Sequence, residues 1–117
     1  MERPDTLVID DQRTFRFPAV YARTVAEGMS RLSERTWNEL WLDYNLGSGV
    51  TIEPILDALE DRAFRGSPFP IGQIFVHTSG PAEGEAMVAA LSPWYPVRRV
   101  VAHSYRAEPL SLARREP

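Results

Sequence analysis

Short runs of apolar residues alternate along this chain with longer segments in which apolar residues recur at helical spacing. Such runs are typical of strands buried on both faces, and their alternation with helices is typical of an α/β domain with a parallel sheet. The pattern predicts five strands, at residues 7–9, 19–22, 40–42, 74–76 and 97–102. The paired charges of Arg98 and Arg99 indicate that the fifth strand lies at an edge of the sheet.

Three helices are predicted between these strands. The first begins after Thr24, a suitable N-cap, and its apolar face holds Val25, Met29 and Leu32. The second begins after Thr51, also a suitable N-cap, and carries one apolar stripe formed by Ile52, Ile55, Leu56, Leu59 and Ala63. The third follows Gly80 and Pro81, ends at Ser92 and Pro93, and faces the sheet with Met87, Val88 and Leu91.

Two helices of a regular doubly wound domain are reduced in this sequence. Residues 12–18 are too few for an ordinary crossover helix, and after residue 102 only residues 110–115 are suited to a helical turn or two. We therefore expect a single flavodoxin-like α/β domain over residues 1–117, with strand order 2-1-3-4-5. Its core covers residues 6–102, and residues 106–117 form a C-terminal tail.

The reduced helices leave one face of the expected sheet without a regular cover. Val8, Trp41 and Phe75 are expected on that face, and a bare apolar face of this size is unusual in soluble monomers. Two covers are open: Phe15 and Phe17 with the tail, or a second subunit. Because self-association is the commonest way to bury such a surface, we predict a symmetric homodimer through this face.

Composition narrows the chemistry that this chain can support. It contains no cysteine, which excludes disulfides, thiolate metal sites and cysteine nucleophiles, and no lysine, which excludes lysine-dependent chemistry. The net charge is −3, so we expect no binding to duplex nucleic acid. The N-terminus lacks an apolar leader, and the longest strictly apolar run, residues 87–91, is too short to span a membrane. These features predict a soluble, cytoplasmic protein.

Polar side chains follow three of the predicted strands at the point where each strand ends. They are, in chain order, Asp10, Asp11, Asp43, Asn45, His77, Thr78 and Ser79. The carboxyl ends of parallel strands meet at one edge of a sheet, and carboxylates gathered there repel one another unless a cation lies between them. A hard ion such as Mg²⁺ takes carboxylate and carbonyl oxygens. The cluster therefore predicts a metal site; the alternative is that these residues only cap the helices that start there.

Three further sets of residues are candidates for the same site. His77 is either a packed, hydrogen-bonded residue or a general acid or base, since its unperturbed pKa of about 6.5 suits proton transfer near neutrality. Arg13 and Arg23 are either phosphate ligands near the same sheet edge or solvated surface residues. Ser79 and Gly80 open a helix whose free amides can bind an anion, as any helix N-terminus can.

Four segments of the sequence resemble a known family. They are residues 7–13, 22–24, 40–47 and 76–81, with the sequences LVIDDQR, ART, LWLDYNLG and VHTSGP. The acidic pair and the aspartate after the third strand are similar to the response-regulator receiver domain, in which they hold Mg²⁺ and the latter accepts phosphate. All four segments are closer to a divergent branch, the cyclic-phosphate processing receiver domains, and the resemblance covers residues 6–102.

The sequence departs from ordinary receiver domains in ways that bear on function. Those domains place a lysine at the end of the fifth strand to contact the phosphoryl group; this chain has none, and arginine differs from lysine in geometry and reach. Ordinary receivers also lack the counterpart of His77. Within the divergent branch the position of Asn45 is often a second aspartate, so one ligand charge is lost here while a ligand carbonyl is kept.

The resemblance implies Mg²⁺- or Mn²⁺-dependent processing of a cyclic phosphate on a nucleotide, another small molecule or an RNA end. The implied metal ligands are Asp10, Asp11, Asp43 and Asn45. The implied catalytic residues are Asp43, Thr78 and His77, which would move a proton, and the implied phosphate ligands are Arg13, Arg23, Ser79 and Gly80. Two alternatives stay open: a non-catalytic module that signals by binding, and a phospho-accepting receiver that uses Asp43.

Overall fold

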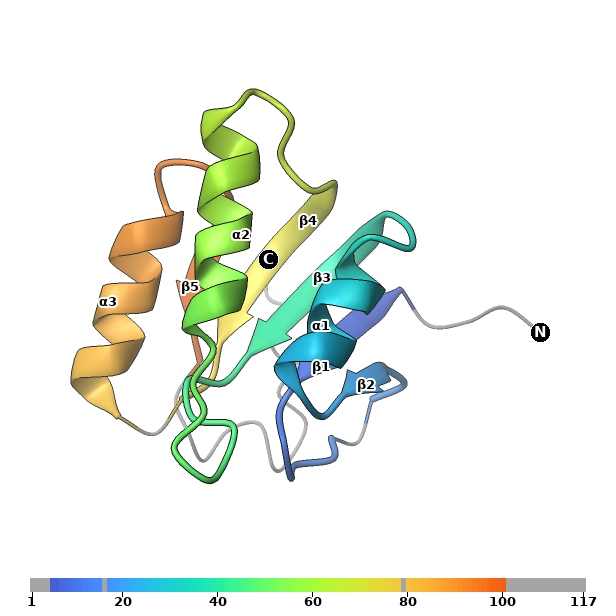
Figure 1. Ribbon diagram of the computed structural model, residues 1–117, viewed down its shortest axis with the longest axis vertical. Helices are drawn as coiled ribbons and strands as arrows, with labels where there is room; N and C mark the ends of the chain where they lie inside the picture. The colour runs from blue at the N-terminus through green and yellow to red at the C-terminus, as the bar shows by residue number, and fades with distance from the viewer. Residues whose placement is uncertain (1–4, 16, 79, 101–117) are drawn as a thin grey trace, which may run out of the picture.

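The structure is a computed structural model that describes residues 5–15, 17–78 and 80–100. Its centre is a parallel sheet with the order β2-β1-β3-β4-β5 (Figure 1). The strands are β1 (Thr6–Ile9), β2 (Val20–Ala22), β3 (Trp37–Leu42), β4 (Ile71–Val76) and β5 (Val97–Arg99). The predicted fold class, the strand order and the edge position of the fifth strand are confirmed.

Some strand ends differ from those predicted. β3 and β4 both begin three residues before the predicted apolar runs, and these additional residues pair with each other, as Trp37 does with Ile71. Because several of them are polar, such as the exposed Asn38, a pattern based on apolar runs misses them. The fifth strand was predicted to reach residue 102; β5 ends at Arg99, and residues 101–102 lie outside the described part of the chain.

Within the described residues, three helices cover one face of the sheet: α1 (Val25–Leu32), α2 (Glu53–Phe64) and α3 (Pro81–Leu91) (Figure 1). Thr24 caps α1 as predicted, because its Oγ1 accepts the Glu27 N–H at 3.1 Å. The residue predicted to cap α2, Thr51, stands one position before the N-cap Ile52, but its Oγ1 accepts the Glu53 N–H at 3.4 Å. Thr51 also forms a β-bridge with Asn45, which keeps it in the preceding loop.

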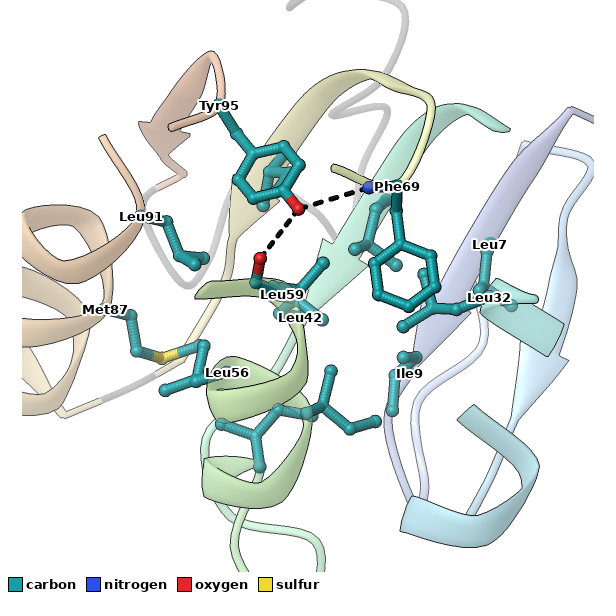
Figure 2. Close-up of a cluster of buried hydrophobic side chains, with 14 of the residues drawn as sticks. Leu7, Ile9, Leu32, Leu42, Leu56, Leu59, Phe69, Met87, Leu91 and Tyr95 are labelled. Carbon is teal, nitrogen blue, oxygen red and sulfur yellow. Dashed lines mark hydrogen bonds between the residues drawn. The ribbon is translucent and has the colours of Figure 1, made fainter. Parts of the chain in front are cut away.

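The main hydrophobic core lies between the sheet and these helices (Figure 2). Buried aliphatic side chains of β1 and β3 pack there against side chains of all three helices. The side chains labelled in Figure 2 are Leu7, Ile9, Leu32, Leu42, Leu56, Leu59, Phe69, Met87, Leu91 and Tyr95. The Tyr95 hydroxyl accepts the Phe69 N–H at 3.3 Å and donates to the Leu59 carbonyl at 2.8 Å. These buried hydrogen bonds tie α2 to the segments before β4 and β5.

The opposite face of the sheet carries a smaller apolar cluster, formed by Val8, Phe15, Trp41 and Phe75. The Phe15 and Phe17 rings stack at 5.0 Å, and they lie 5.4 and 5.1 Å from the Trp41 ring. The Phe15 N–H donates to the Tyr21 hydroxyl at 2.8 Å, which holds the loop in place. The described residues between β1 and β2 form no helix, so the reduced first helix is confirmed, and aromatic side chains of this loop cover part of the face.

The end of the chain lies outside what the structure describes. The predicted tail, residues 106–117, and the helical turn or two predicted at residues 110–115 belong to that part. Among the described residues, no helix combines the length and the apolar character needed to cross a membrane.

Candidate functional site

The register of the sheet brings three of the predicted site residues into one row. β1, β3 and β4 end together, because Ile9 pairs with Leu42 and Leu42 with Val76. The residues that directly follow are Asp10, Asp43 and His77. Backbone pairing continues into them, since the N–H groups of Asp43 and His77 donate to strand carbonyls at 3.2 and 3.0 Å. These three side chains therefore stand next to one another at the carboxyl edge of the sheet.

Three carboxylates converge at this edge. Asp10, Asp11 and Asp43 each place one carboxylate oxygen within 4.8 Å of the other two. Asp10 is 1% exposed and Asp43 is 7% exposed, whereas Asp11 is half-buried. Negative charges this close, in partly buried surroundings, repel one another unless a cation compensates them. Oxygen ligands in this number and spacing suit a hard divalent ion such as Mg²⁺ or Mn²⁺.

Local structure fixes the orientation of Asp10. Its Oδ1 accepts the backbone N–H groups of Gln12 and Arg13, both at 2.9 Å, in the turn that follows β1. Its Oδ2 is buried and has no hydrogen-bond partner among the residues that the structure describes. Buried oxygens are normally satisfied, so this atom is suited to be a ligand of a cation. The donor set of the site therefore fits a bound divalent metal.

Arg13 lies between two of the carboxylates. Its Nη1 is 3.2 Å from Asp43 Oδ2 and 3.5 Å from Asp10 Oδ2. Asp43 also accepts the Tyr44 N–H on Oδ1 at 2.8 Å. Burial, and after it the charge of Asp10, raise the pKa of the Asp43 carboxyl from 3.8 to about 6, although Arg13 opposes this change. One arginine therefore does not fully compensate the negative charge of this site.

His77 is fully buried behind the carboxylates. Its Nδ1 is 3.6 Å from Asp10 Oδ2, and the Phe15 ring meets the imidazole edge-on at 5.3 Å. Burial lowers the pKa of His77 to about 4, and this effect exceeds the opposing effect of the Asp10 charge. The imidazole is therefore neutral at pH 7 and lies against Asp10 rather than solvent.

Arg23 holds the loop that carries Arg13. Its Nη1 donates to the carbonyls of Asp10 and Arg13, at 3.1 and 2.6 Å, and its Nη2 donates to Thr14 Oγ1 at 3.2 Å. The guanidinium also lies over the Tyr21 ring, 4.5 Å from its centroid. These contacts give Arg23 a role in positioning the loop, while the phosphate contact that the sequence suggested for it stays a prediction.

The carboxylates open into a cleft of about 260 Å³. The residues that line it are Asp10, Asp11, Gln12, Arg13, Asp43, Asn45 and Gly47. Gly47 has a φ of +89°, and a Cβ on it would lie 2.8 Å from Asp11 Oδ2, so glycine lets the loop approach this carboxylate. Sequence reasoning selected neither Gln12 nor Gly47 as a site residue. The signal for Gly47 was the Gly-Ser-Gly turn a few residues after the third strand.

The predicted site residues after His77 are placed differently from those at the cleft. Thr78 is buried, 1% exposed, and is not among the residues that line the cleft. Gly80 is the N-cap of α3, and the Glu83 carboxylate lies against its Cα, where a Cβ would be. Ser79 lies outside the described residues. The geometry therefore brings Arg13 and Asn45 to the carboxylates, but not Thr78 or Gly80.

Most of this chain matches the sequence model of a known protein family. A family model described as the cyclic-phosphate processing receiver domain matches residues 6–93, about three quarters of the chain. The chain belongs to this family. The matched residues of this cyclic-phosphate processing receiver domain include β1 to β4, α1 to α3 and the three clustered aspartates. Comparison with curated proteins and with solved structures gave no match.

Proposed function

We propose that this receiver domain binds Mg²⁺ or Mn²⁺ and hydrolyses a cyclic phosphate on a nucleotide or an RNA end. The convergence of Asp10, Asp11 and Asp43, with carboxylate oxygens within 4.8 Å of one another, carries the proposal. Membership of a cyclic-phosphate processing family supports the substrate class. Asn45 lines the same cleft, and its side-chain carbonyl is proposed as a further, uncharged ligand.

Hydrolysis requires charge compensation at phosphorus and a proton for the leaving oxygen. A divalent ion held by the three carboxylates supplies the first by polarising the phosphoryl group, and lowers the pKa of bound water. Water then adds across one ring P–O bond: the water oxygen bonds to phosphorus, and the ring oxygen leaves with a proton. Arg13 pairs with Asp10 and Asp43. With a divalent ion bound to these carboxylates, its guanidinium would be able to donate hydrogen bonds to two phosphate oxygens.

His77 is proposed to act through Asp10 rather than on the substrate. It is fully buried, and its contact with the carboxylates is the 3.6 Å approach of Nδ1 to Asp10 Oδ2. Groups behind a metal ligand fix the orientation and basicity of that ligand. The alternative, in which His77 itself passes a proton to the leaving oxygen, requires the imidazole to reach the cleft. Direct phosphate contacts of Thr78, Ser79 and Gly80 remain predictions from the sequence.

A phospho-accepting receiver that uses Asp43 is the second candidate. Asp43 supports it, because this carboxylate follows the central strand β3 and lies beside Asp10 at the cleft. The absence of any lysine from the chain argues against it, since ordinary receivers place a lysine on the phosphoryl group. A non-catalytic module that binds a metal and a partner without turnover is the third candidate.

A panel of 2′,3′- and 3′,5′-cyclic nucleotides, incubated with Mg²⁺ or Mn²⁺ and analysed by chromatography, tests the proposed hydrolysis. Wild type should open at least one of these rings. Asp10→Asn should reduce turnover at least about 100-fold, because loss of groups that merely support a metal ligand already costs about 10- to 100-fold. Asp61→Asn is the matched control and should turn over as wild type does, since Asp61 is exposed on α2 and lies outside the cleft.

Two results would contradict the hydrolysis proposal. No ring opening in the panel, with metal binding intact, would favour the non-catalytic module. Incubation with acetyl phosphate addresses the other candidate: a stable aspartyl-phosphate that disappears in Asp43→Asn would favour the phospho-accepting receiver.

The symmetric homodimer stays a separate prediction. Phe15 and Phe17 pack around Trp41 within one chain, and Val8, Trp41 and Phe75 are at most 3% exposed there, so the proposed second subunit would lie over a face that one chain already buries. Light scattering behind a sizing column, at tens of micromolar protein, should then give twice the chain mass of 13.2 kDa. A single species at 13.2 kDa would show that one chain covers this face by itself.

A further inference from the structure

A second hollow lies away from the carboxylates, between two helices. α2 and α3 run side by side over the sheet (Figure 1). A groove of about 390 Å³ lies between them. The apolar part of its lining consists of Leu56, Met87, Ala82, Ala86 and Ala90. Because alanine side chains are short, α3 leaves room in the groove for large side chains of another molecule. The site around Asp10 does not use this groove.

The charged part of the same lining is entirely acidic. It consists of Glu53, Asp57 and Glu60 of α2 and Glu83 of α3, and no described residue that lines the groove carries a positive charge. The arginines near the end of α2 are engaged elsewhere. Arg62 lies over the Phe69 ring at 4.2 Å and donates to the Ser67 carbonyl, and Arg65 pairs with Asp61 at 3.1 Å. The groove therefore combines an apolar surface with four carboxylates, and no positive charge stands among its described lining residues.

Two exposed aromatic side chains stand at the far end of these helices. Phe64, the last residue of α2, is 78% exposed, and Trp94, three residues after the end of α3, is 42% exposed. Their rings meet edge-on with centroids 6.3 Å apart, so they form one apolar patch across the two helix ends. Large aromatic side chains left in water in this way are typical of interaction surfaces.

We propose that the α2–α3 groove and the Phe64–Trp94 pair together form a docking surface for a basic amphipathic helix of a partner protein. The apolar face of that helix lies on the alanines of α3, above Leu56 and Met87, which are 8% and 1% exposed and belong to the core. Its arginine or lysine side chains pair with the four carboxylates, and an apolar side chain near one end contacts the aromatic pair. This arrangement is the helix-in-groove mode of recognition, with the charges setting the choice of partner.

Charge and length decide between possible occupants. A second copy of this chain carries a net charge of −3 and meets repulsion at an acidic groove. The length of α2, 12 residues, corresponds to about 18 Å of helix, so a partner helix of three to four turns spans the groove and reaches the aromatic pair.

A synthetic peptide of about 14 residues tests this surface on the intact chain. The peptide has leucines three and four positions apart on one face, arginines on both flanks and no tryptophan. Of the three tryptophans of the chain, Trp37 and Trp41 are fully buried and Trp94 is exposed, so binding should shift tryptophan emission to shorter wavelength. Anisotropy of the labelled peptide in a buffer with EDTA should give a micromolar Kd, independently of any metal or turnover.

Variants on one helix separate this surface from general attraction by charge. Glu60→Arg should weaken peptide binding at least about 10-fold, and Trp94→Phe should abolish the emission shift. Asp61→Arg is the matched control: it makes the same charge change in the same helix, but Asp61 lies outside the groove lining, so affinity should change less than about 2-fold. Melting curves confirm that each variant is folded.

Several outcomes would overturn the docking proposal. They are no binding at 0.2 mM peptide, equal losses in Glu60→Arg and Asp61→Arg, and equal binding of a peptide with glutamate in place of arginine. Sedimentation of the chain alone gives a fourth: a dimer that Glu60→Arg dissociates would assign the groove to a second copy of this chain.

Discussion

Without metal, Asp43→Asn should melt several degrees above wild type at pH 7.5, and addition of 10 mM Mg²⁺ should stabilise wild type only. The pKa of Asp43 is raised to about 6 in the folded chain, so this carboxyl holds its proton more tightly when folded than when unfolded. The free energy of unfolding therefore falls as pH rises from about 4 through about 6, and the full loss persists above that range. A neutral asparagine avoids this loss, which raises the free energy of unfolding by at most about 3 kcal/mol.

Mg²⁺ should reverse the order of the two proteins. An ion that binds only the folded chain stabilises it by mass action, by about 2.7 kcal/mol at 100 times its Kd, which raises the melting temperature by roughly 10 °C in a domain of this size. Asp43→Asn lacks one of the three converging carboxylates and should gain little. Scanning calorimetry in EDTA and in Mg²⁺ measures both effects, with Asp61→Asn as control. Equal Mg²⁺ responses in wild type and Asp43→Asn would count against the metal site.

His77→Gln should reduce cyclic-phosphate turnover by about 100-fold or more while Mg²⁺ affinity changes only a few-fold. The side chain stands behind Asp10, with Nδ1 3.6 Å from Asp10 Oδ2, so its loss leaves the carboxylates in place but one of them poorly oriented. His77→Asn and His77→Gln separate the two proposed roles. An asparagine amide nitrogen occupies the place of Nδ1 and a glutamine amide nitrogen that of Nε2, and neither amide titrates near neutrality.

The comparison of these two variants decides the role of His77. Turnover close to wild type in His77→Asn, but not in His77→Gln, would identify a positioning residue that acts through Asp10. Turnover lost in both variants, with melting temperature and Mg²⁺ affinity preserved, would identify proton transfer by the imidazole itself. Turnover preserved in both would reduce His77 to a packed core residue, the other interpretation that its burial allows.

The sheet and the row of site residues were predictable because both follow from local pattern. A buried strand such as β1 is a continuous apolar run, and the first polar residue after it, here Asp10, lies at the carboxyl edge in any parallel sheet. The convergence of Asp10 and Asp43 then needed only the strand order. Where a strand began with polar residues, as β3 does around Asn38, the apolar pattern placed its start too late.

The remaining features depend on tertiary contacts that no local pattern reveals. Arg23 follows the second strand near the expected phosphate edge, yet its guanidinium is directed at backbone carbonyls of the first loop. Gly80 opens a helix, but the Glu83 carboxylate, from one turn later, lies against it. The complete burial of His77 depends partly on the Phe15 ring, which reaches it from the loop between β1 and β2. Sequence spacing fixes none of these side-chain directions.

The loop after β1 ties the stability of this domain to its chemistry. It begins with Asp10 and Asp11 of the carboxylate cluster and continues into Phe15, which contacts both Trp41 of the apolar face and His77. A helix between β1 and β2 would separate folding from chemistry, whereas here one loop of ten residues, 10–19, contributes to both. Random substitutions in this loop should therefore rarely alter folding without altering activity, and the segment should tolerate little sequence drift. Substitutions meant to raise the stability of the domain without changing its chemistry should therefore be placed in the three helices.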